Sequence, residues 1–220
     1  MAKITVVKNI LDANDRIAEE NRKLFDREKI YVLNLMSSPG AGKTSLVERT
    51  IVSLQNKYKI GVIEGDIQGS ADAERIASLG VPVVQINTGG ACHIDGNMIR
   101  EALPGLDLAQ IDLLIAENVG NLVCPAEFKV GENTKVMVLS TPEGSDKPAK
   151  YPLMFQQSEA MIINKIDLLP YVDFDMAQAK RDALTLNPKL KIFEVSCTSS
   201  VGLKDWFDWL SGRIESFQST

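Results

Sequence analysis

The sequence contains little of what several protein classes require. It has one histidine and three cysteines in 220 residues, which excludes a histidine-rich tract and does not suit a disulfide framework. No apolar run approaches the ~20 residues that cross a bilayer, and the start MAKITVVKN lacks the apolar segment and cleavage site of a secretory signal. We therefore expect a cytoplasmic protein with reduced cysteines and no membrane partner.

An excess of basic charge is also lacking. The formal net charge is −5, whereas a surface that coats nucleic acid needs clustered lysine and arginine. We therefore expect no nucleic-acid partner, and any bound phosphate must be held by a local site. Hydrophobic residues make up 45% of the chain and charged residues 24%, which is typical of a globular protein with one sizeable core.

The hydrophobic pattern alternates between strand-like and helix-like segments. Short apolar runs, typical of buried strands, lie at 30–36, 59–65, 81–87, 112–118, 135–141, 159–165 and 190–196. Longer segments with helical periodicity lie between or after them at 46–56, 71–79, 174–186 and 203–217. This alternation predicts an α/β fold with a mostly parallel sheet and helices on both faces.

The first strand candidate leads through a glycine-rich loop, SSPGAGKTS, into a helix. Such a loop wraps backbone N–H groups around a polyphosphate, with Lys43 reaching the outer phosphates and the Thr44 hydroxyl binding Mg²⁺. Against the pattern G-x-x-x-x-G-K-[ST] the first glycine falls on Ser37, where a side chain narrows the allowed backbone angles. The predicted phosphate-binding residues are Pro39, Gly40, Ala41, Gly42, Lys43, Thr44 and Ser45. The segment predicts a P-loop NTPase.

Two later segments indicate the base of the nucleotide. Asn164, Lys165 and Asp167 resemble the N-K-x-D element of GTPases, in which the aspartate accepts hydrogen bonds from guanine N1–H and the 2-amino group. Adenine offers no such pair of donors, so this site should reject ATP. The segment Ser196-Cys197-Thr198 weakly resembles the element whose backbone contacts the guanine oxygen, which places Cys197 at the base pocket.

Carboxylates follow two further strand candidates. Glu117, three residues before Gly120, matches the position of Asp-x-x-Gly in Ras-like GTPases and predicts a magnesium ligand, while Gly120 can approach the γ-phosphate. Asp66 ends the neighbouring strand candidate and could contact Mg²⁺ or orient water, with Asp72 as a second helper. We predict Lys43, Asp66 and Glu117 as catalytic. No Ras-type glutamine is evident, so slow intrinsic turnover is expected.

The single histidine lies beside a cysteine in the segment GGACHIDG. Cys92 and His93 follow one strand candidate and Cys124 follows another, so the three side chains can converge near the nucleotide. Two thiolates and an imidazole suit Ni²⁺ or Zn²⁺ and leave one position open for water or a second subunit. The alternative is ordinary packing, with buried cysteines and a hydrogen-bonded histidine.

Five segments together carry a more specific signal: SSPGAGKTS, GGACHIDG, ENVGNLVCP, EGSDKPAKYP and NKIDLLPY. Over nearly the whole chain they resemble the HypB family of hydrogenase-maturation GTPases. The resemblance implies a nucleotide-dependent homodimer that helps a nickel chaperone partner insert nickel into the large subunit of nickel-iron hydrogenase. It also implies that Cys92, His93 and Cys124 bind metal at the dimer interface, with Lys147 close to that interface.

The segment before residue 29 predicts one further helix. It is charged on most faces, but Ile10, Ile17 and Leu24 recur at seven-residue spacing. We assign residues 1–28 to an N-terminal helical arm, a candidate docking element, and residues 29–220 to a single GTPase domain.

Three other functions are compatible with parts of the pattern. A metal sensor or scaffold would bind GTP with negligible turnover, which fits the absence of an evident general base. A urease-accessory nickel GTPase carries Cys-Pro-His, whereas here His93 follows Cys92 directly and Pro125 follows Cys124. A metabolite kinase also uses a phosphate loop and Mg²⁺, but guanine selectivity argues against it.

Overall fold

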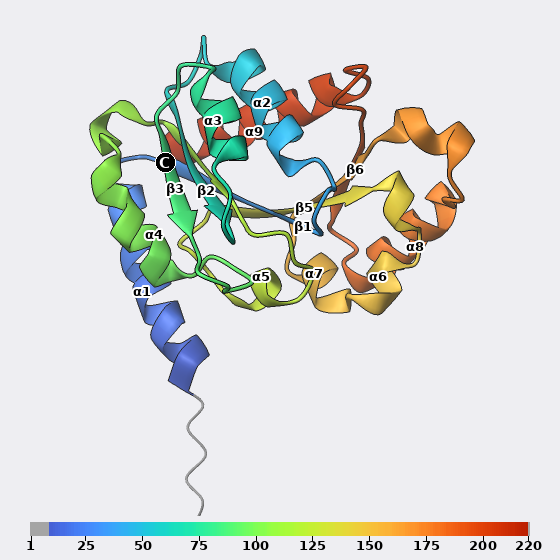
Figure 1. Cartoon of the computed structure of the whole chain (residues 1–220), viewed down its shortest axis with the longest axis horizontal. Coiled ribbons are helices and arrows are strands. Elements are labelled where there is room, and N and C mark those ends of the chain that lie inside the picture. Colours follow the sequence, from blue (N-terminus) through green and yellow to red (C-terminus); the bar gives the residue numbers. More distant parts are fainter. Residues whose placement is uncertain (1–8, 220) are drawn as a thin grey trace, which may run out of the picture.

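The centre of the protein is a seven-stranded parallel sheet, seen in a computed structural model that describes residues 9–219 (Figure 1). The strands lie in the order β3-β2-β4-β1-β5-β6-β7. Their bounds are Tyr31–Ser37 for β1, Ile60–Asp66 for β2, Val83–Asn87 for β3, Leu113–Glu117 for β4, Thr134–Ser140 for β5, Ala160–Asn164 for β6 and Lys191–Glu194 for β7. All seven strand predictions are confirmed, and so is the fold class.

The apolar runs of the central strands arise because both faces of the sheet are covered. Along β1, Leu33 and Leu35 belong to the core on one side, whereas Val32 and Met36 belong to the cores on the other. Successive side chains of a strand point to opposite faces. A strand buried on both sides must therefore be apolar at nearly every position.

Helices form a layer on each face of the sheet (Figure 1). One layer consists of α2 Lys43–Leu54, α3 Ala71–Ala77 and α9 Leu203–Gln218. The other consists of α1 Asn9–Arg27, α4 Gly96–Ala102, α5 Cys124–Glu127, α6 Lys147–Lys150, α7 Pro152–Gln156 and α8 Met176–Leu186. Short 3-10 helices lie at Leu103–Gly105, Leu108–Gln110, Thr141–Glu143 and Ile166–Tyr171. Among residues 9–219, no helix combines the length and apolar character that a membrane crossing requires.

The N-terminal helix is present, but its buried face is not the expected one. Ile10 is 77% exposed, and Ile17 and Leu24 are only half-buried. The buried positions of α1 are Asn14, Ala18, Asn21 and Phe25. Their spacing of four, three and four residues is the period of one helix face. The seven-residue stripe therefore lies at the edge of the buried face, where Leu24 packs against the core.

Two buried asparagines explain why this face was missed. Asn21 Nδ2 donates to the carbonyls of Gly96 and Val130 at 2.7 and 3.2 Å, and Asn14 Oδ1 accepts from the Gly96 backbone N–H at 2.8 Å. These bonds satisfy backbone groups that packing would otherwise leave unpaired. A hydrophobicity pattern does not register polar residues that are buried for this reason.

The strand order brings particular loops together. Although β2 follows β1 in the chain, β4 lies between them in the sheet. The loops after β1, β2 and β4 therefore emerge side by side at the carboxyl ends of the strands, where parallel α/β sheets bind ligands. These loops carry the P-loop and the carboxylates predicted from the sequence.

Candidate functional site

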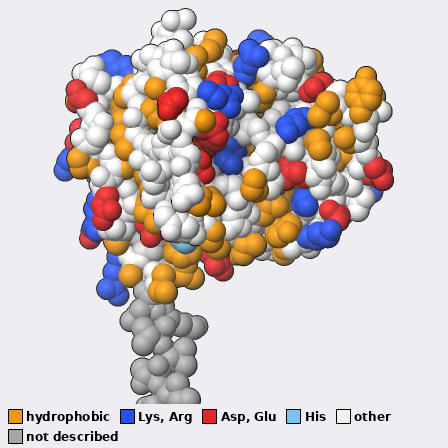
Figure 2. Space-filling view, in the orientation of Figure 1, with side chains coloured by type: hydrophobic (Ala, Val, Ile, Leu, Met, Phe, Trp, Pro, Cys, Tyr) orange, Lys and Arg blue, Asp and Glu red, His pale blue; other side chains and the backbone are white. Residues whose placement is uncertain are grey.

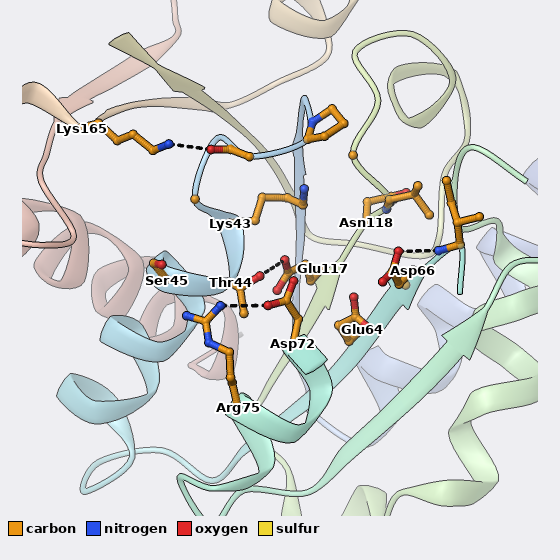
Figure 3. A pocket seen from close by; sticks show the side chains of 17 residues that line it. Lys43, Thr44, Ser45, Glu64, Asp66, Asp72, Arg75, Glu117, Asn118 and Lys165 are labelled. Atoms are coloured by element: carbon orange, nitrogen blue, oxygen red, sulfur yellow. Dashed lines mark hydrogen bonds and ion pairs between the residues drawn. The ribbon is translucent and has the colours of Figure 1, made fainter. Parts of the chain in front are cut away.

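A pocket of about 450 Å³ opens at the carboxyl ends of β1, β2 and β4. Figure 2 shows this hollow, with acidic and basic side chains gathered in it, and Figure 3 shows its lining side chains from close by. The predicted residues that line it are Pro39, Gly40, Gly42, Lys43, Thr44, Ser45, Asp66, Glu117, Gly120 and Lys165. Asp72 also lines it, together with Glu64, Arg75 and Asn118, which the sequence analysis did not assign.

The P-loop departs from the glycine pattern without strain. Ser37 is the last residue of β1, where the backbone is extended, so this position needs no glycine. Its hydroxyl accepts a hydrogen bond from Lys43 Nζ at 2.9 Å. Burial lowers the pKa of Lys43, while the nearby Glu117 opposes that change. Position 42, by contrast, requires glycine, because Gly42 has φ 96° and a Cβ there would lie 2.4 Å from Asn164 Nδ2.

The N-K-x-D segment braces the P-loop. Asn164 Nδ2 donates to the Ala41 carbonyl at 3.0 Å, and Asn164 Oδ1 accepts from the Cys197 backbone N–H at 3.2 Å. Lys165 Nζ donates to the Gly40 carbonyl at 2.7 Å. One buried asparagine therefore joins the phosphate loop to the loop after β7. The structure thus brings together the three segments assigned to the nucleotide.

The remaining predicted base residues lie around this asparagine. Asp167 is exposed on the 3-10 helix Ile166–Tyr171, and Ser196 is fully buried. Cys197 and Thr198 line a neighbouring hollow next to Ser45. Burial raises the pKa of Cys197 to about 11, so this thiol stays protonated at neutral pH. The guanine contacts of these residues stay a prediction.

The predicted magnesium ligands lie on one side of the pocket. Thr44 Oγ1 donates to Glu117 Oε1 at 2.8 Å, while Glu117 Oε2 is buried and has no hydrogen-bond partner within the described chain. Burial raises the pKa of Glu117 to about 7, although Lys43 and the Thr44 hydrogen bond oppose this. A buried, unpaired carboxylate oxygen beside the P-loop threonine is suited to Mg²⁺ or to a water bound to it.

The two aspartates have other partners. Asp66 accepts hydrogen bonds from the backbone N–H groups of Ile67 and Gly69 at 2.6 and 3.1 Å. Asp72 pairs with Arg75 at 2.9 Å (Figure 3). Arg75 also pairs with Glu48 at 2.8 Å. Asp66 thus shapes the turn after β2, while Asp72 and Arg75 form one wall of the pocket.

Glu64 is a pocket residue that the sequence analysis missed. Glu64 on β2 lies opposite Glu117 on β4 in the strand register, so both carboxylates lie at the same level of the sheet. Its side chain is 3% exposed, and its Oε2 has no hydrogen-bond partner among the described residues. Burial, followed by the nearby charges of Glu117 and Asp66, raises the pKa of Glu64 to about 8. The available signal was a glutamate inside the apolar run KIGVIEG.

A pH effect on stability follows from Glu64 in the protein free of nucleotide and divalent cations. The folded state keeps a proton that the unfolded chain releases at pH values above about 4.5, so stability falls as pH rises from about 4.5 to about 8. We expect Glu64→Gln to melt about 2–4 °C above wild type at pH 8.5, which corresponds to ~1 kcal/mol. Near pH 5 the two melting curves should coincide.

Thermal denaturation followed by circular dichroism in EDTA measures this difference. The control is Glu19→Gln, which changes an exposed glutamate on α1 and should leave the pH profile unaltered. A wild-type melting temperature that rises between pH 5 and 8, with no gain from Glu64→Gln, would contradict the prediction.

Cys92, His93 and Cys124 form a compact cluster. The two sulfur atoms lie 2.9 Å apart, and His93 Nδ1 lies 3.8 Å from Cys92 Sγ. Within residues 9–219 this is the one group of three such side chains whose ligand atoms all lie within 4.8 Å of one another. The His93 ring packs on Phe128 with centroids 3.8 Å apart, and burial lowers the pKa of His93, which favours its neutral, metal-binding form. The predicted convergence of the three side chains is therefore present.

Lys135 supports the element that carries Cys124. Its buried ammonium donates to the carbonyls of Pro125, Ala126 and Phe128 at 3.3, 2.8 and 3.2 Å. These are carbonyls at the end of α5, which begins at Cys124, and a helix as short as α5 cannot satisfy them internally. Lys135 thus stabilises the turn that presents one thiol and the ring that packs on His93.

Lys135→Met should destabilise the protein, because three carbonyls lose their buried donor. We expect a loss of about 1–3 kcal/mol, which lowers the melting temperature by roughly 2–4 °C for each kcal/mol. The control, Lys129→Met, removes an exposed lysine that pairs with Asp15 at 3.0 Å and should cost under about 1 kcal/mol. Equal melting temperatures for the two variants would show that the carbonyl contacts contribute little.

The segment EGSDKPAKYP contacts the P-loop through its first residue. The Glu143 carboxylate accepts from the Ser38 hydroxyl and from the Ser140 backbone N–H, the latter at 2.6 Å. Lys147 begins α6, and its ammonium lies 5.9 Å from the centre of the Tyr151 ring, away from the pocket lining. Its assignment to a subunit interface stays a prediction.

Comparison with known proteins gives the family. A family model described as CobW/HypB/UreG, nucleotide-binding domain, matches residues 31–194. The chain is 49% identical over 202 residues to hydrogenase maturation factor HypB of Escherichia coli K12, covering 92% of this chain and 70% of that protein. The chain belongs to the HypB family. A probable hydrogenase maturation factor HypB of Methanocaldococcus jannaschii is 38% identical over 212 residues, and the alignment covers 96% of this chain and 96% of that protein.

Solved structures of HypB proteins have the same fold. HypB from Helicobacter pylori in complex with nickel superposes with a TM-score of 0.88 at 41% identity, covering 94% of this chain and 98% of that one. HypB from Archaeoglobus fulgidus gives 0.87 at 39% identity, with coverages of 92% and 99%. An LAO/AO transport system kinase, at 16% identity and a TM-score of 0.57, shares the fold alone.

Proposed function

We propose that this HypB-family chain is a GTP-hydrolysing metallochaperone that assists nickel insertion into nickel-iron hydrogenase. The observation that carries the proposal is the position of the Cys92–His93–Cys124 cluster. It lies on the loops that follow β3 and β4, and the loop after β4 also lines the nucleotide pocket. Nickel is the cargo, with Zn²⁺ as the competing ion, since two thiolates and an imidazole suit either and leave a coordination position for exchange.

The nucleotide is GTP rather than ATP. Asp167 supplies the acceptor for guanine N1–H and the 2-amino group, while Asn164 holds the P-loop and the loop containing Cys197 in place. Adenine would leave the carboxylate unpaired at the base, which costs binding free energy. This assignment depends on the N-K-x-D segment and on the bracing hydrogen bonds around it.

Mg²⁺ fits the group formed by Thr44 and Glu117, and the unpaired Glu117 Oε2 supports this assignment. Bound there, the ion neutralises phosphate charge during hydrolysis. Lys43 is available for the outer phosphates, and Gly120 admits the γ-phosphate close to the backbone. Asp66 orients a water through its carboxylate. Both carboxylate oxygens of Asp66 already accept hydrogen bonds from the backbone N–H groups of Ile67 and Gly69. Asp66 is therefore a weak activator of water, which fits slow intrinsic turnover.

GTP binding draws two copies of the chain into a homodimer, with the metal cluster and Lys147 near the shared face. Hydrolysis reverses the association and changes the affinity for the metal. A nickel chaperone delivers or receives the ion, the hydrogenase large subunit is its destination, and the complex works in the cytoplasm. The exposed N-terminal end of α1, including Ile10, is the candidate docking element.

Size-exclusion chromatography with light scattering tests the proposal. Wild type, Cys92→Ala and the control Cys197→Ala are run with GDP or a non-hydrolysable GTP analogue, with and without Ni²⁺. We expect a dimer that needs the analogue, and bound metal that disappears in Cys92→Ala but not in Cys197→Ala. If the same amount of metal bound with either nucleotide, and in Cys92→Ala as in wild type, the nickel-delivery function would be overturned, even if GTP still bound.

A GTP-binding sensor or scaffold with negligible turnover is the second candidate. The observation in its favour is that both carboxylate oxygens of Asp66 are engaged by backbone N–H groups, so a free general base is not evident there. Single-turnover hydrolysis with and without candidate partners separates the two functions. A rate that stays at background under every condition favours the scaffold.

A further inference from the structure

The loop that joins β4 to α5 borders both the nucleotide pocket and the cysteine cluster. Its first residues, Asn118, Val119 and Gly120, line the pocket, and its last leads into Cys124. Gly120 packs so closely on the P-loop that a Cβ there would lie 2.8 Å from Pro39 N. A movement of the P-loop therefore acts on this loop through direct contact.

Asn118 is the buried centre of this region. Its side chain is fully buried, and its Oδ1 accepts from the backbone N–H groups of Ile94 and Val119 at 2.9 and 3.0 Å. Its Nδ2 donates to Asn34 Oδ1 at 3.2 Å, and its backbone N–H donates to the Leu35 carbonyl at 2.9 Å. One amide side chain thus joins three segments: strand β1, the nucleotide-pocket loop, and the residue directly after His93.

The segment that carries Cys92 and His93 has a second attachment to the same loop. Asn121 Nδ2 donates to the Cys92 carbonyl at 3.2 Å, and Asn121 Oδ1 accepts from the Val123 N–H at 2.9 Å. The two attachments differ in one respect. Asn118 lines the nucleotide pocket, whereas Asn121 is not among the residues that line it.

We propose that Asn118 is the positioning residue through which the nucleotide changes the affinity of the metal cluster. A shift of the Asn118–Gly120 segment toward or away from the phosphates moves the acceptor of the Ile94 N–H, and so moves His93 relative to Cys124. Leaving the buried Ile94 N–H without an acceptor costs free energy, so the two loops move together. This inference rests on the proposed function, because it requires GTP and metal to bind at these two sites.

The measurement is the ratio of Ni²⁺ dissociation constants in Mg²⁺–GDP and in a non-hydrolysable GTP analogue with Mg²⁺, obtained by competition with a chromophoric chelator. Coupled sites typically change affinity by about 5- to 150-fold, so wild type should give a ratio in this range, in either direction. For Asn118→Ala we expect a ratio within about twofold of one. A variant that merely loosens the fold would weaken nickel binding equally in both states and keep the ratio.

Asn121→Ala is the matched control, since it removes an amide from the same loop and one bond to the metal-bearing segment. It should change both dissociation constants alike and preserve the ratio. Should Asn118→Ala fail to fold, Asn34→Ala decides, because it removes the acceptor that orients the Asn118 amide without altering either loop; its ratio should move toward one.

The outcomes separate the inference from the function beneath it. A wild-type ratio retained in Asn118→Ala, or lost in Asn121→Ala alone, overturns the role of Asn118 and leaves the metallochaperone intact. A wild type that binds nickel and GTP with a ratio of one removes the coupling and this role together. A wild type that binds no nickel overturns the proposed function itself.

Discussion

We expect Asp167→Asn to lower the affinity for GTP by about 100-fold or more and to create affinity for xanthosine triphosphate. In the proposed GTP complex the carboxylate accepts two hydrogen bonds from guanine, and bonds to a charged acceptor contribute about 1.5–3 kcal/mol each. Asparagine offers one acceptor and one donor, which conflicts with the guanine 2-amino group. Xanthine has an oxygen at that position, so the variant can donate to it. Titration with fluorescent analogues of both nucleotides measures the exchange in preference.

The control for this change lies nearby in the sequence. Asp173 is exposed and follows the 3-10 helix that contains Asp167, so Asp173→Asn should bind GTP as wild type does. Because Asp167 is itself exposed, the substitution should leave the melting temperature of the nucleotide-free protein within about 1 °C. Undiminished GTP binding by Asp167→Asn would remove the basis for guanine specificity and reopen the kinase alternative.

Cys124→Ala should lower the affinity for Ni²⁺ by more than about 100-fold. Altering groups that only support metal ligands commonly costs about 10- to 100-fold, and this change removes one of the three proposed ligands themselves. Cys124 also has a raised pKa, first because of its hydrogen bond with Cys92 and then because of burial. Metal binding must therefore release protons, so the nickel affinity of wild type should rise with pH.

The thiolate-to-nickel charge-transfer band in the near ultraviolet reports this binding directly. Cys197→Ala, which removes the buried thiol beside the base loop, should retain the band at full intensity. If Cys124→Ala retained it and Cys197→Ala lost it, the cluster of Cys92, His93 and Cys124 would not be the nickel site.

The sequence predicted those parts of the structure whose cause is local. The central strands were readable because strands covered on both faces are apolar at nearly every position, as β1 is apart from Asn34 and Ser37. The P-loop was readable because Gly42 adopts a positive φ that other residues avoid. The helices α4 to α7 were not predicted. Three of them, α5 to α7, have only four or five residues, which are too few to display a helical period.

The predicted site was less complete than the fold. The sequence analysis found Lys43, Thr44 and Glu117 because they belong to motifs whose residues have a fixed spacing and a chemical role. The structure places all three in one pocket. Glu64 and Asn118 belong to no such pattern, and each acquires its importance from a neighbour in another strand or loop. Glu64 lies beside Glu117 because β2 pairs with β4, which the chain order does not reveal.

By itself the sequence determined the fold class, the nucleotide loop and the identity of the candidate metal ligands, because local periodicity and side-chain chemistry are properties of short segments. The tertiary structure alone decided which loops are neighbours. Placing β4 between β1 and β2 puts the P-loop, Glu64 and Glu117 in one pocket. The bond from the Ile94 N–H to Asn118 then joins that pocket to the cysteines. Such pairings depend on burying the whole sheet at once, and no short segment contains that information.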